Sequence, residues 1–501
     1  MAGVSEQLDE AFVQGFMLPG NVPALQSALH QTAQLLSDYF DKTNHSYSGL
    51  AADQLDHAIG GMLAETEEPH AVSEVLGEVR THIMSHSLNV NHPHTAAHLQ
   101  CPPLIPSVCA DTIASALNQS LDSWDQSPAA TVVEQHMTEW LCRLFQFPES
   151  AGGTFTTGGT QSNYMGLLLA RDHYCLHVLG RDVKKYGFPP KASRFKILCS
   201  EEAHFTVKKS AAQLGLGEEA VILIPADNRK KMDARLLEET IHRIKAGGDI
   251  PMAVVGTAGT TDFGSIDPLE EIGTIAAAEK IWLHVDAAYA GALALSSQYA
   301  CKLRGITQAD SISVDFHKLF YQPVSCGAFL VKKQSFFQHV AHPTDYLNPD
   351  EDKEDGIVNL VDHSIQTTKR FDALKVLVTL KTIGTRQWGQ LIDQSISNAA
   401  MLAEKIEADP SLRLVMRPEM NAVVFRYRSQ NEEENGLHRR IQQHLYHSGE
   451  AAIAKTKVNG VPHLKCTLLH PCTTEERLEQ LVQAVVNTGR KLEKRKKEET
   501  V

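Results

Sequence analysis

The stretch Ser313–Val331 reads SVDFHKLFYQPVSCGAFLV and places Lys318 in an otherwise apolar run. Its last part, VSCGAFLV at 324–331, is typical of a buried strand. Burying an ammonium is costly unless the group is paired or loses its proton. A lysine beside such a strand either extends its charge to water, which is the common case for a lone lysine, or is kept there for chemistry.

Around this stretch, short apolar runs alternate with helical patterns. Strands are predicted at 195–200, 220–226, 252–259, 281–288 and 311–316. Helical periodicity with acidic residues lies between them, as in DARLLEETIHRIKAG and PLEEIGTIAAAEK. Strands separated by helices indicate βαβ units and a mostly parallel sheet, whose ligands bind beyond the carboxyl ends of the strands.

The flanking regions have different patterns. Residues 1–95 are helical in pattern and rich in Leu, Ala, Glu and His. Beyond residue 386, LRLVMRPEMNAVVFRYR and HLKCTLLHP look like strands, with helical patterns around them. We therefore expect an N-terminal helical segment (1–95), a large α/β domain (96–385) and a small α+β C-terminal domain (386–501).

Composition narrows the class of protein. The 501 residues carry 47 Lys and Arg against 60 Asp and Glu, a net charge of −13 with His neutral. This acidic balance disfavours nucleic-acid binding. No apolar run reaches about 18 residues, and the first residues lack the order of a secretion signal, so no membrane partner is expected. Nine cysteines without a CxxC pair indicate reduced thiols and a cytoplasmic location.

Three further motifs carry candidate site residues. In GTFTTGGTQSNYMGLLLARD, Gly159 and Thr160 open a helix, where backbone N–H groups suit a phosphate, although a plain helix start fits as well. Asp286 ends the strand of HVDAAYAGA and could hold the protonated nitrogen of a pyridine ring, or simply cap a helix. His204 in SEEAHFTVKKSA could stack on an aromatic ring or be an ordinary histidine.

Jointly these motifs are more specific than any one of them. A phosphate cradle, a carboxylate, a stackable imidazole and a buried lysine are the parts that hold pyridoxal 5'-phosphate, with Lys318 as the Schiff-base amine. The chain resembles the group II pyridoxal-phosphate-dependent amino-acid decarboxylases over about residues 80–480, and most closely the bacterial diamino-acid branch, the lysine and L-2,4-diaminobutyrate decarboxylases of siderophore and polyamine pathways. The stretches that carry this resemblance are SWDQSPAATVVEQ, TTGGTQSN, GTAGTTDFGSIDPL, HVDAAYAGA, DFHK and QTTKRFDALK.

The resemblance implies a fold-type I α/β enzyme and a cofactor-binding set made of Gly159, Thr160, His204, Thr260, Asp286, Ala288, His317 and Lys318. In that set Lys318 would form the Schiff base, His317 would contact phosphate and His204 would stack on the ring. Many relatives have Asn where this chain has Asp315. Because a carboxylate repels phosphate unless it is paired or faces away, Asp315 is left outside the set.

The resemblance also implies a homodimer with shared active sites. The segment PTDYLNPDEDKEDGI resembles the mobile loop of the family, in which Tyr346 would deliver a proton, although its composition alone fits a solvated surface loop. SLDSWDQSPA resembles a part that crosses the dimer interface, so Asp122 and Asp125 are expected near the substrate. His98 and Gln100 would line the substrate pocket.

A metal site is not expected. His92, His94 and His98 have ligand-like spacing, but no carboxylate pattern joins them.

The predicted function is decarboxylation of an L-amino acid to CO2 and an amine. Asp122 and Asp125 favour a diamino acid, L-2,4-diaminobutyrate or L-lysine. Alternatives are an aspartate, glutamate or aromatic substrate, or another pyridoxal-phosphate reaction such as amino transfer or oxidative deamination; Tyr346, where Phe would favour deamination, favours decarboxylation. An inactive binding protein on the same scaffold is disfavoured because Lys318, Asp286 and His204 are all present.

Overall fold

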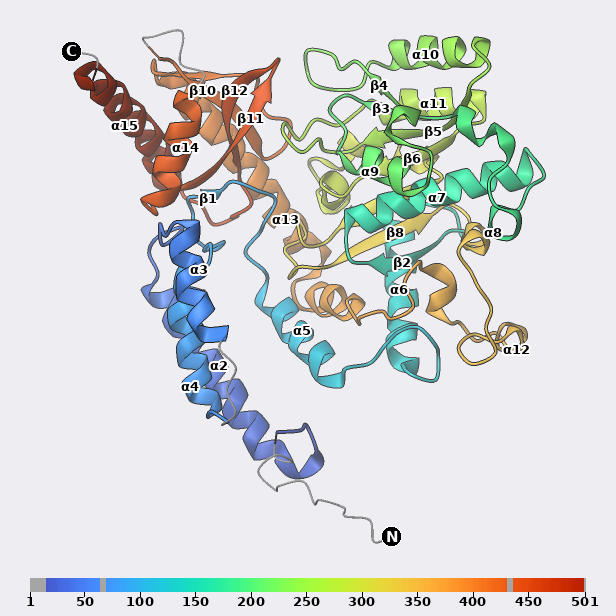
Figure 1. Cartoon of the computed structure of the whole chain (residues 1–501), viewed down its shortest axis with the longest axis horizontal. Coiled ribbons are helices and arrows are strands. Elements are labelled where there is room, and N and C mark those ends of the chain that lie inside the picture. The colour runs from blue at the N-terminus through green and yellow to red at the C-terminus, as the bar shows by residue number, and fades with distance from the viewer. Residues whose placement is uncertain (1–14, 64–68, 430–435, 500–501) are drawn as a thin grey trace.

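The structure is a computed structural model that describes residues 15–63, 69–429 and 436–499. Figure 1 shows a large α/β body, a smaller layered unit built from the C-terminal part of the chain, and an arm of helices built from the first described residues. Within these residues, no helix is both long enough and apolar enough to cross a membrane.

The α/β body is built on a seven-stranded sheet of order β2-β8-β7-β6-β5-β3-β4. Neighbours from β4 to β7 are parallel, whereas β8 is antiparallel to both β7 and β2. The sheet is therefore mostly parallel, as predicted. The strands span Gly152–Thr156 (β2), Phe195–Ser200 (β3), Val221–Ile224 (β4), Ile250–Thr257 (β5), Trp282–Asp286 (β6), Ser311–Asp315 (β7) and Gly327–Val331 (β8).

Helices cover both faces of this sheet. Alternate residues of a strand point to opposite faces, and Leu198 and Val254 belong to one apolar cluster, whereas Ile197 and Val255 belong to another. The first cluster also contains residues of α10 (Ala234–Ala246) and α11 (Leu269–Glu279), and the second contains residues of α7 (Gly159–His177) and α9 (Thr206–Gln213). Burial on both faces explains why these strands are continuous apolar runs. Two further helices of the body are α6 (Pro128–Leu144) and α8 (Val183–Tyr186).

The smaller unit has a five-stranded sheet of order β1-β11-β12-β10-β9. Its strands are β1 (Thr95–Ala96), β9 (Leu412–Leu414), β10 (Ala422–Tyr427), β11 (Ala452–Val458) and β12 (Val461–Thr467), and its helices are α14 (Leu437–His447) and α15 (Glu475–Glu499). All pairings are antiparallel except that of β1 with β11. The chain that leaves the N-terminal arm thus adds a strand to the C-terminal sheet.

The two units are joined by α13 (Ala373–Ala408), which is interrupted at Gly384 (φ 69°, ψ 165°). Only the second part of α13 contributes to the separate apolar core of the smaller unit. The boundary predicted after residue 385 falls beside this interruption. We retain the division into 1–95, 96–385 and 386–501 as a proposal, supported by these two cores and by the kink.

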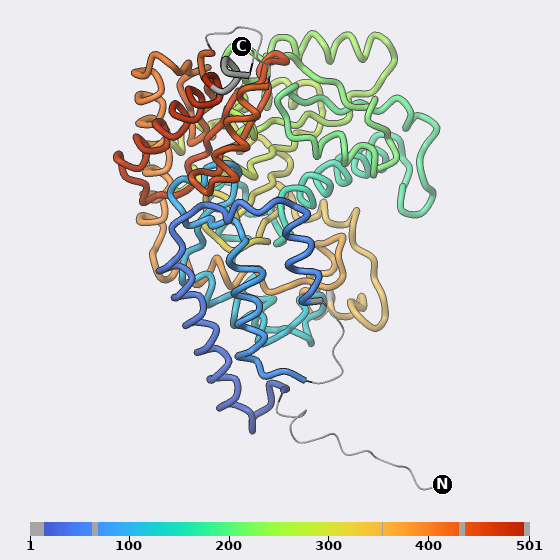
Figure 2. Tube along the Cα trace, turned by 60° about the vertical axis from the view of Figure 1, so that its left-hand side comes forward, coloured from blue at the N-terminus to red at the C-terminus, as the bar shows by residue number. Residues whose placement is uncertain are grey.

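The N-terminal arm consists of α2 (Val22–Lys42), α3 (Ala52–Gly60) and α4 (Val72–Glu78). Figure 2 shows these helices side by side in front of the body. Within the described chain, no residue of α2 is buried. Apolar side chains of the arm such as Leu29, Phe40 and Val72 are exposed, as are Ile105 and Leu117 on α5 (Ile105–Leu117). The arm has an apolar face that its own chain does not cover.

Candidate active site

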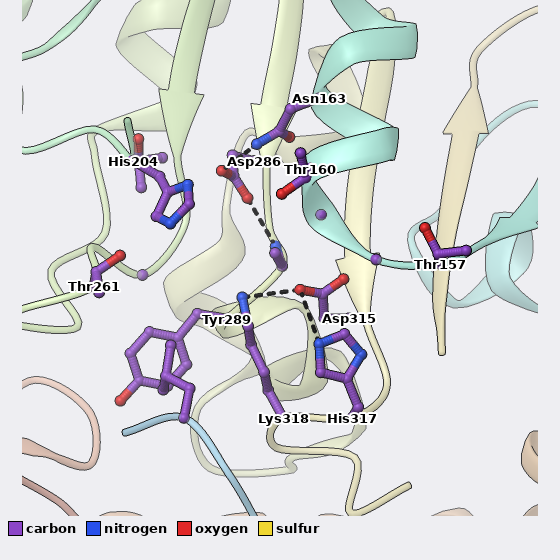
Figure 3. Close-up of a pocket in the computed structure, with 16 residues that line it drawn as sticks. Thr157, Thr160, Asn163, His204, Thr261, Asp286, Tyr289, Asp315, His317 and Lys318 are labelled. Atoms are coloured by element: carbon purple, nitrogen blue, oxygen red, sulfur yellow. Dashed lines mark hydrogen bonds and ion pairs between the residues drawn. The ribbon is translucent and has the colours of Figure 1, made fainter. Parts of the chain in front are cut away.

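A cavity of about 400 Å³ lies at the carboxyl ends of the parallel strands. The segments that follow β3, β5, β6 and β7 all contribute to its wall, together with the start of α7. Figure 3 shows Lys318 and Asp286 entering this space from opposite sides, with His204 beside them. The lining residues are Leu99, Thr157, Gly158, Gly159, Thr160, Asn163, His204, Thr257, Gly259, Thr261, Asp286, Ala288, Tyr289, Asp315, His317 and Lys318.

Two glycines form the floor of the cavity at the start of α7. Gly158 caps the helix at φ 144°, a conformation that residues with a side chain rarely adopt. A Cβ atom at Gly158 would lie 3.1 Å from Cε1 of His317, and one at Gly159 would lie 3.1 Å from both Oδ2 of Asp315 and the Cβ of Ala288. No side chain of these two residues therefore covers the backbone where a bound group would meet the positive end of the helix.

Asp286 is held by a network of buried hydrogen bonds. Its carboxylate accepts from Nδ2 of Asn163 at 2.7 Å, from Oγ of Ser313 at 3.2 Å and from the backbone N–H of Ala288 at 3.1 Å. Burial would raise the pKa of this carboxyl, yet the Lys318 ammonium, the Asn163 amide and the His284 ring together hold it below its ordinary value. Asp286 therefore offers a fixed negative charge at the cavity wall.

Asn163 links Asp286 to His204 at the top of the cavity. Its amide also donates to Oγ1 of Thr206 at 3.0 Å, and that hydroxyl lies 2.9 Å from Nδ1 of His204. The side-chain oxygen of Asn163 accepts a hydrogen bond from the Ser313 hydroxyl and lies within hydrogen-bond distance of Nε2 of His284. Burial lowers the pKa of His204 by more than Asp286 raises it, so the ring is suited to stacking as a neutral aromatic.

Lys318 forms an ion pair at the lower side of the cavity. Its Nζ lies 2.9 Å from Oδ2 of Asp315, and Nε2 of His317 lies 3.7 Å from the same oxygen. Asp315 is 3% exposed, and its second oxygen Oδ1 has no hydrogen-bond partner within the described chain. That oxygen is 3.5 Å from the Cβ position of Gly158, so the carboxylate adjoins the glycine floor.

This set fits pyridoxal phosphate. The glycine floor has room for a phosphate, the buried carboxylate matches a protonated ring nitrogen, and the lysine supplies an amine between them. Sequence comparison gives the same result, because residues 56–428, more than half of the chain, match the profile described as "Pyridoxal-dependent decarboxylase conserved domain".

The chain belongs to this family of pyridoxal-dependent decarboxylases. It is 38% identical to an L-2,4-diaminobutyrate decarboxylase of Acinetobacter baumannii, with 92% of each chain covered. It is 39% identical to the enzyme of that name from Rhizobium meliloti (strain 1021), over 93% of this chain and 92% of the relative.

A solved structure agrees with these comparisons. The crystal structure titled as the glutamate decarboxylase domain of diaminobutyrate-pyruvate transaminase and L-2,4-diaminobutyrate decarboxylase from Vibrio parahaemolyticus superposes with a TM-score of 0.89 at 37% identity, covering 97% of this chain and all of that one. The protein is therefore a carboxy-lyase of the fold-type I class that acts on an amino acid and uses pyridoxal phosphate.

The decarboxylase brings most of its predicted cofactor residues to one cavity. Gly159, Thr160, His204, Asp286, Ala288, His317 and Lys318 all line it. Thr260 instead lies behind the wall, where its hydroxyl accepts from the backbone N–H of Ser265 at 3.1 Å, and its neighbours Gly259 and Thr261 line the space. The roles of these residues towards the cofactor stay predictions.

The predicted substrate residues lie outside this cavity in the single chain. His98 and Gln100 are exposed on either side of Leu99, which does line it. Tyr346 is 85% exposed and borders a second cavity with Arg171 and Asp172.

Asp122 and Asp125 differ in their exposure to solvent. Asp122 is 6% exposed and accepts from the backbone N–H of Ser123, whereas Asp125 is exposed and accepts from the Ser123 hydroxyl. The backbone of Asp122 accepts from Val361 N–H, which holds this segment beside the end of the Tyr346 loop.

Three lining residues of note were not predicted. Asn163 follows Gly159 by one helical turn, so its place on the same face of α7 could have been read from the motif TTGGTQSN. Tyr289, whose hydroxyl donates to Oδ1 of Asn421 at 2.7 Å, lies in the motif HVDAAYAGA, and Leu99 lies between His98 and Gln100, but neither residue was itself expected in the site.

Proposed function

We propose that this decarboxylase acts on L-2,4-diaminobutyrate or a close diamino acid such as L-lysine, and releases CO2 and a diamine. The observation that carries the proposal is the similarity, at 38% and 39% identity over more than nine tenths of the chain, to two enzymes named L-2,4-diaminobutyrate decarboxylase. Relatives with acidic or aromatic substrates in their names are less similar or cover less of the chain, as with 32% over 75% of the chain and 26% over 91%.

The charges in the cavity support this choice. Among the described residues, no arginine lines it, and its carboxylates are Asp286 and Asp315. A substrate with a distal carboxylate would lack the cation that such a group needs when it leaves water. A distal ammonium has a candidate partner in Asp125, provided by a second subunit, because that carboxylate is exposed.

The residues of the chain have distinct roles in the proposed reaction. Bound pyridoxal phosphate supplies an electron sink for the pair left at Cα when CO2 departs. Asp286 keeps a positive charge on the ring nitrogen, and the Asn163 network keeps Asp286 ionised and oriented. Lys318 would supply the amine that holds the cofactor. Tyr346 supplies the proton that replaces the carboxylate on Cα.

Tyr346 can do this only from a closed loop, and its 85% exposure shows that the single chain leaves it outside the cavity. We propose that a homodimer completes the site, with the loop and the segment around Asp125 meeting the cavity of the partner. The uncovered apolar faces of α2 and α5 support such an interface.

A panel of L-amino acids tests the substrate proposal. Purified enzyme with added pyridoxal phosphate is assayed for CO2 and amine release from diaminobutyrate, lysine, ornithine, aspartate, glutamate and tryptophan, with Lys318→Ala as the inactive control. We expect the highest kcat/KM for diaminobutyrate or lysine. A higher value for aspartate, glutamate or tryptophan would contradict the proposal.

Two matched variants test the recognition of the distal ammonium. Asp125→Asn should raise KM for the diamino acid by roughly tenfold, because a desolvated ammonium loses its partner, with kcat for a neutral substrate unchanged. Asp122→Asn should affect stability more than KM, since Asp122 is buried. Equal KM in the wild type and Asp125→Asn would exclude Asp125 as the partner.

We also propose a reducing, cytoplasmic location. All nine cysteines lie within the described residues and are free thiols, several of them buried. Free thiols are stable in such a compartment. Cell fractionation with an antibody to the protein tests this proposal.

A further inference from the structure

Three histidines from two distant parts of the chain meet at the C-terminal end of α7, whereas the glycine floor lies at its start. His173 and His177 are one helical turn apart on α7, and His339 ends the short helix Gln334–His339. One ligand nitrogen from each ring lies within 4.8 Å of the others. The ring centroids are 4.3 Å (173–177), 5.7 Å (173–339) and 6.2 Å (177–339) apart.

The burial of this cluster leaves polar atoms unsatisfied. His339 is 5% exposed, and its Nε2 is buried without a hydrogen-bond partner in the described chain; the same holds for Nδ1 of His173. Orphaned buried ring nitrogens are unfavourable unless a further group satisfies them. Phe336 and Trp282 pack against His173, so the inner side of the cluster is apolar.

We propose that His173, His177 and His339 bind a Zn²⁺ ion. Three imidazoles with neither thiolate nor carboxylate suit zinc and similar transition metals rather than magnesium or calcium. Zn–N bonds of about 2.0–2.1 Å in a tetrahedral arrangement place ring centroids roughly 5 Å apart, close to the spacing observed. The exposed His177 leaves one side open for entry of the ion and for a water as fourth ligand.

The protonation state of the rings agrees with this geometry. Burial lowers the pKa of both His173 and His339 to about 4. Both rings are therefore neutral near neutral pH and offer a lone pair without first releasing a proton.

Other charges around the cluster are also accounted for. Lys184 faces His339, but its ammonium donates to the backbone oxygens of Gln338 and Ala341 at 2.7 and 2.9 Å. Lys333 faces His173 and lies over the Phe336 ring, and Asp182 contributes a negative charge near His339. The lysines weaken the attraction for a cation without occupying the ligand atoms.

Such an ion would join two functional segments. The α7 helix begins at the glycine floor of the cofactor cavity, and His339 stands seven residues before Tyr346. His339, His342 and Tyr346 border the same second cavity. The metal would fix the start of the loop that carries Tyr346 to α7, the helix that begins at the glycine floor.

Metal titration of the holoenzyme tests the proposal. Tag-free enzyme is saturated with pyridoxal phosphate, freed of excess cofactor and metal by chelation and gel filtration, and titrated with ZnCl₂ in a calorimeter. We expect one Zn²⁺ per chain, a higher melting temperature with Zn²⁺, and a tetrahedral visible spectrum when Co²⁺ replaces it. His177→Ala and His339→Ala should each weaken binding by about tenfold or more.

Controls make the outcome decisive. Because His339 is buried, the exposed His177 gives the variant whose folding is least affected. His92→Ala removes a ring from the His92–His94 pair, whose centroids are 5.3 Å apart, and should leave binding unchanged. The proposal is overturned if the wild type shows no saturable binding, if His177→Ala binds as tightly as the wild type, or if only His92→Ala loses the ion.

Discussion

Substitution of Asp286 tests whether its charge or its geometry matters at the ring nitrogen of the cofactor. We expect Asp286→Asn to lower kcat by about 10²-fold or more, because the amide keeps the shape but not the charge, while bound cofactor is still visible by absorption. Ser313→Ala is the matched control, since it removes the hydroxyl that donates to this carboxylate and to Asn163 but leaves the charge in place, and it should cost about 1 kcal/mol or less. Equal losses in the two variants would show that the charge is not the important property.

Asp315 lies where many relatives have Asn, and it pairs with Lys318 beside the glycine floor. In the proposed reaction Lys318 would have to leave this ion pair before its amine bonds to the cofactor, and the carboxylate would repel the phosphate. Asp315→Asn should therefore speed reconstitution of apoenzyme with pyridoxal phosphate by roughly tenfold, followed by stopped-flow absorbance. Slower reconstitution would mean that Asp315 is needed to position Lys318.

At the scale of elements, α7 carries the site because it can lie very close to β6. A Cβ atom at Gly166 would be 2.5 Å from Nδ1 of the buried His284. Gly166→Ala should lower the free energy of unfolding by about 1–3 kcal/mol and lower kcat, because Asn163 moves with the helix.

Urea unfolding and steady-state kinetics measure both effects. Gly77→Ala on α4 is the control, since its Cβ position has no atom within 4 Å in the described structure and alanine favours helix by about 1 kcal/mol. If Gly77→Ala destabilised the protein as much as Gly166→Ala, close packing of α7 would not be the cause.

The elements also show what a sequence can and cannot predict. Strands β3 to β8 lie within three residues of their predicted limits, because burial on both faces requires long apolar runs. Strand β2, GGTFT, was not predicted, since its glycines disfavour a strand and are explained only by the fold: a Cβ at Gly153 would be 2.6 Å from Cδ2 of Leu330 on β8. Strand β11 was not predicted either, because it is half exposed and carries two lysines.

The candidate site likewise contains residues that could be placed from the sequence, whereas the histidine cluster could not be. Lys318, Asp286 and His204 could be placed together from sequence because each adjoins the carboxyl end of a predicted strand in one sheet. Gly159 joined them through the motif TTGGTQSN, since the strand before it, β2, was not predicted. The meeting of His339 with His173 could not be predicted, since the two are far apart in sequence and only the packing of the folded chain brings them together.

For the molecule as a whole, the exposed apolar face of the N-terminal arm predicts that activity depends on the association of subunits. We expect sedimentation to show a dimer or a multiple of it. The double variant Leu29→Ser with Phe40→Ser, at exposed positions of α2, should weaken the dimer and make specific activity fall on dilution. Lys42→Ser on the same helix is the control. Full activity of a monomer at assay concentration would contradict the shared site.

The buried histidines predict loss of stability in acid. The pKa values of His92, His173, His284, His339 and His438 are lowered to about 4, chiefly by burial. Between about pH 6.5 and 4 the unfolded chain therefore binds protons that the folded chain does not, so the free energy of unfolding falls as pH falls. Asp267, whose pKa burial raises to about 6, acts in the opposite sense, as do Asp172 and Asp310, whose pKa values burial also raises, but these carboxyls are fewer than the five histidines.

Urea unfolding at pH 7.5 and 5.0, in the presence of a chelator, measures this effect. His438→Gln should show a smaller fall than the wild type, and His136→Gln, at an exposed position, should show the same fall. Equal stability at the two pH values would be inconsistent with neutral buried rings.

The pairing of β1 with β11 has a practical consequence for anyone who shortens the chain. Thr95 and Ala96 align with Ala452 and Ile453 and occupy the outer side of β11. A truncation that began after residue 96 would leave that strand with free N–H and C=O groups along an open edge, a ready template for intermolecular sheet growth. Shortened versions intended for crystallisation or display should therefore start upstream of Thr95, or carry a charged or proline substitution on β11 that blocks stacking of one molecule onto the next.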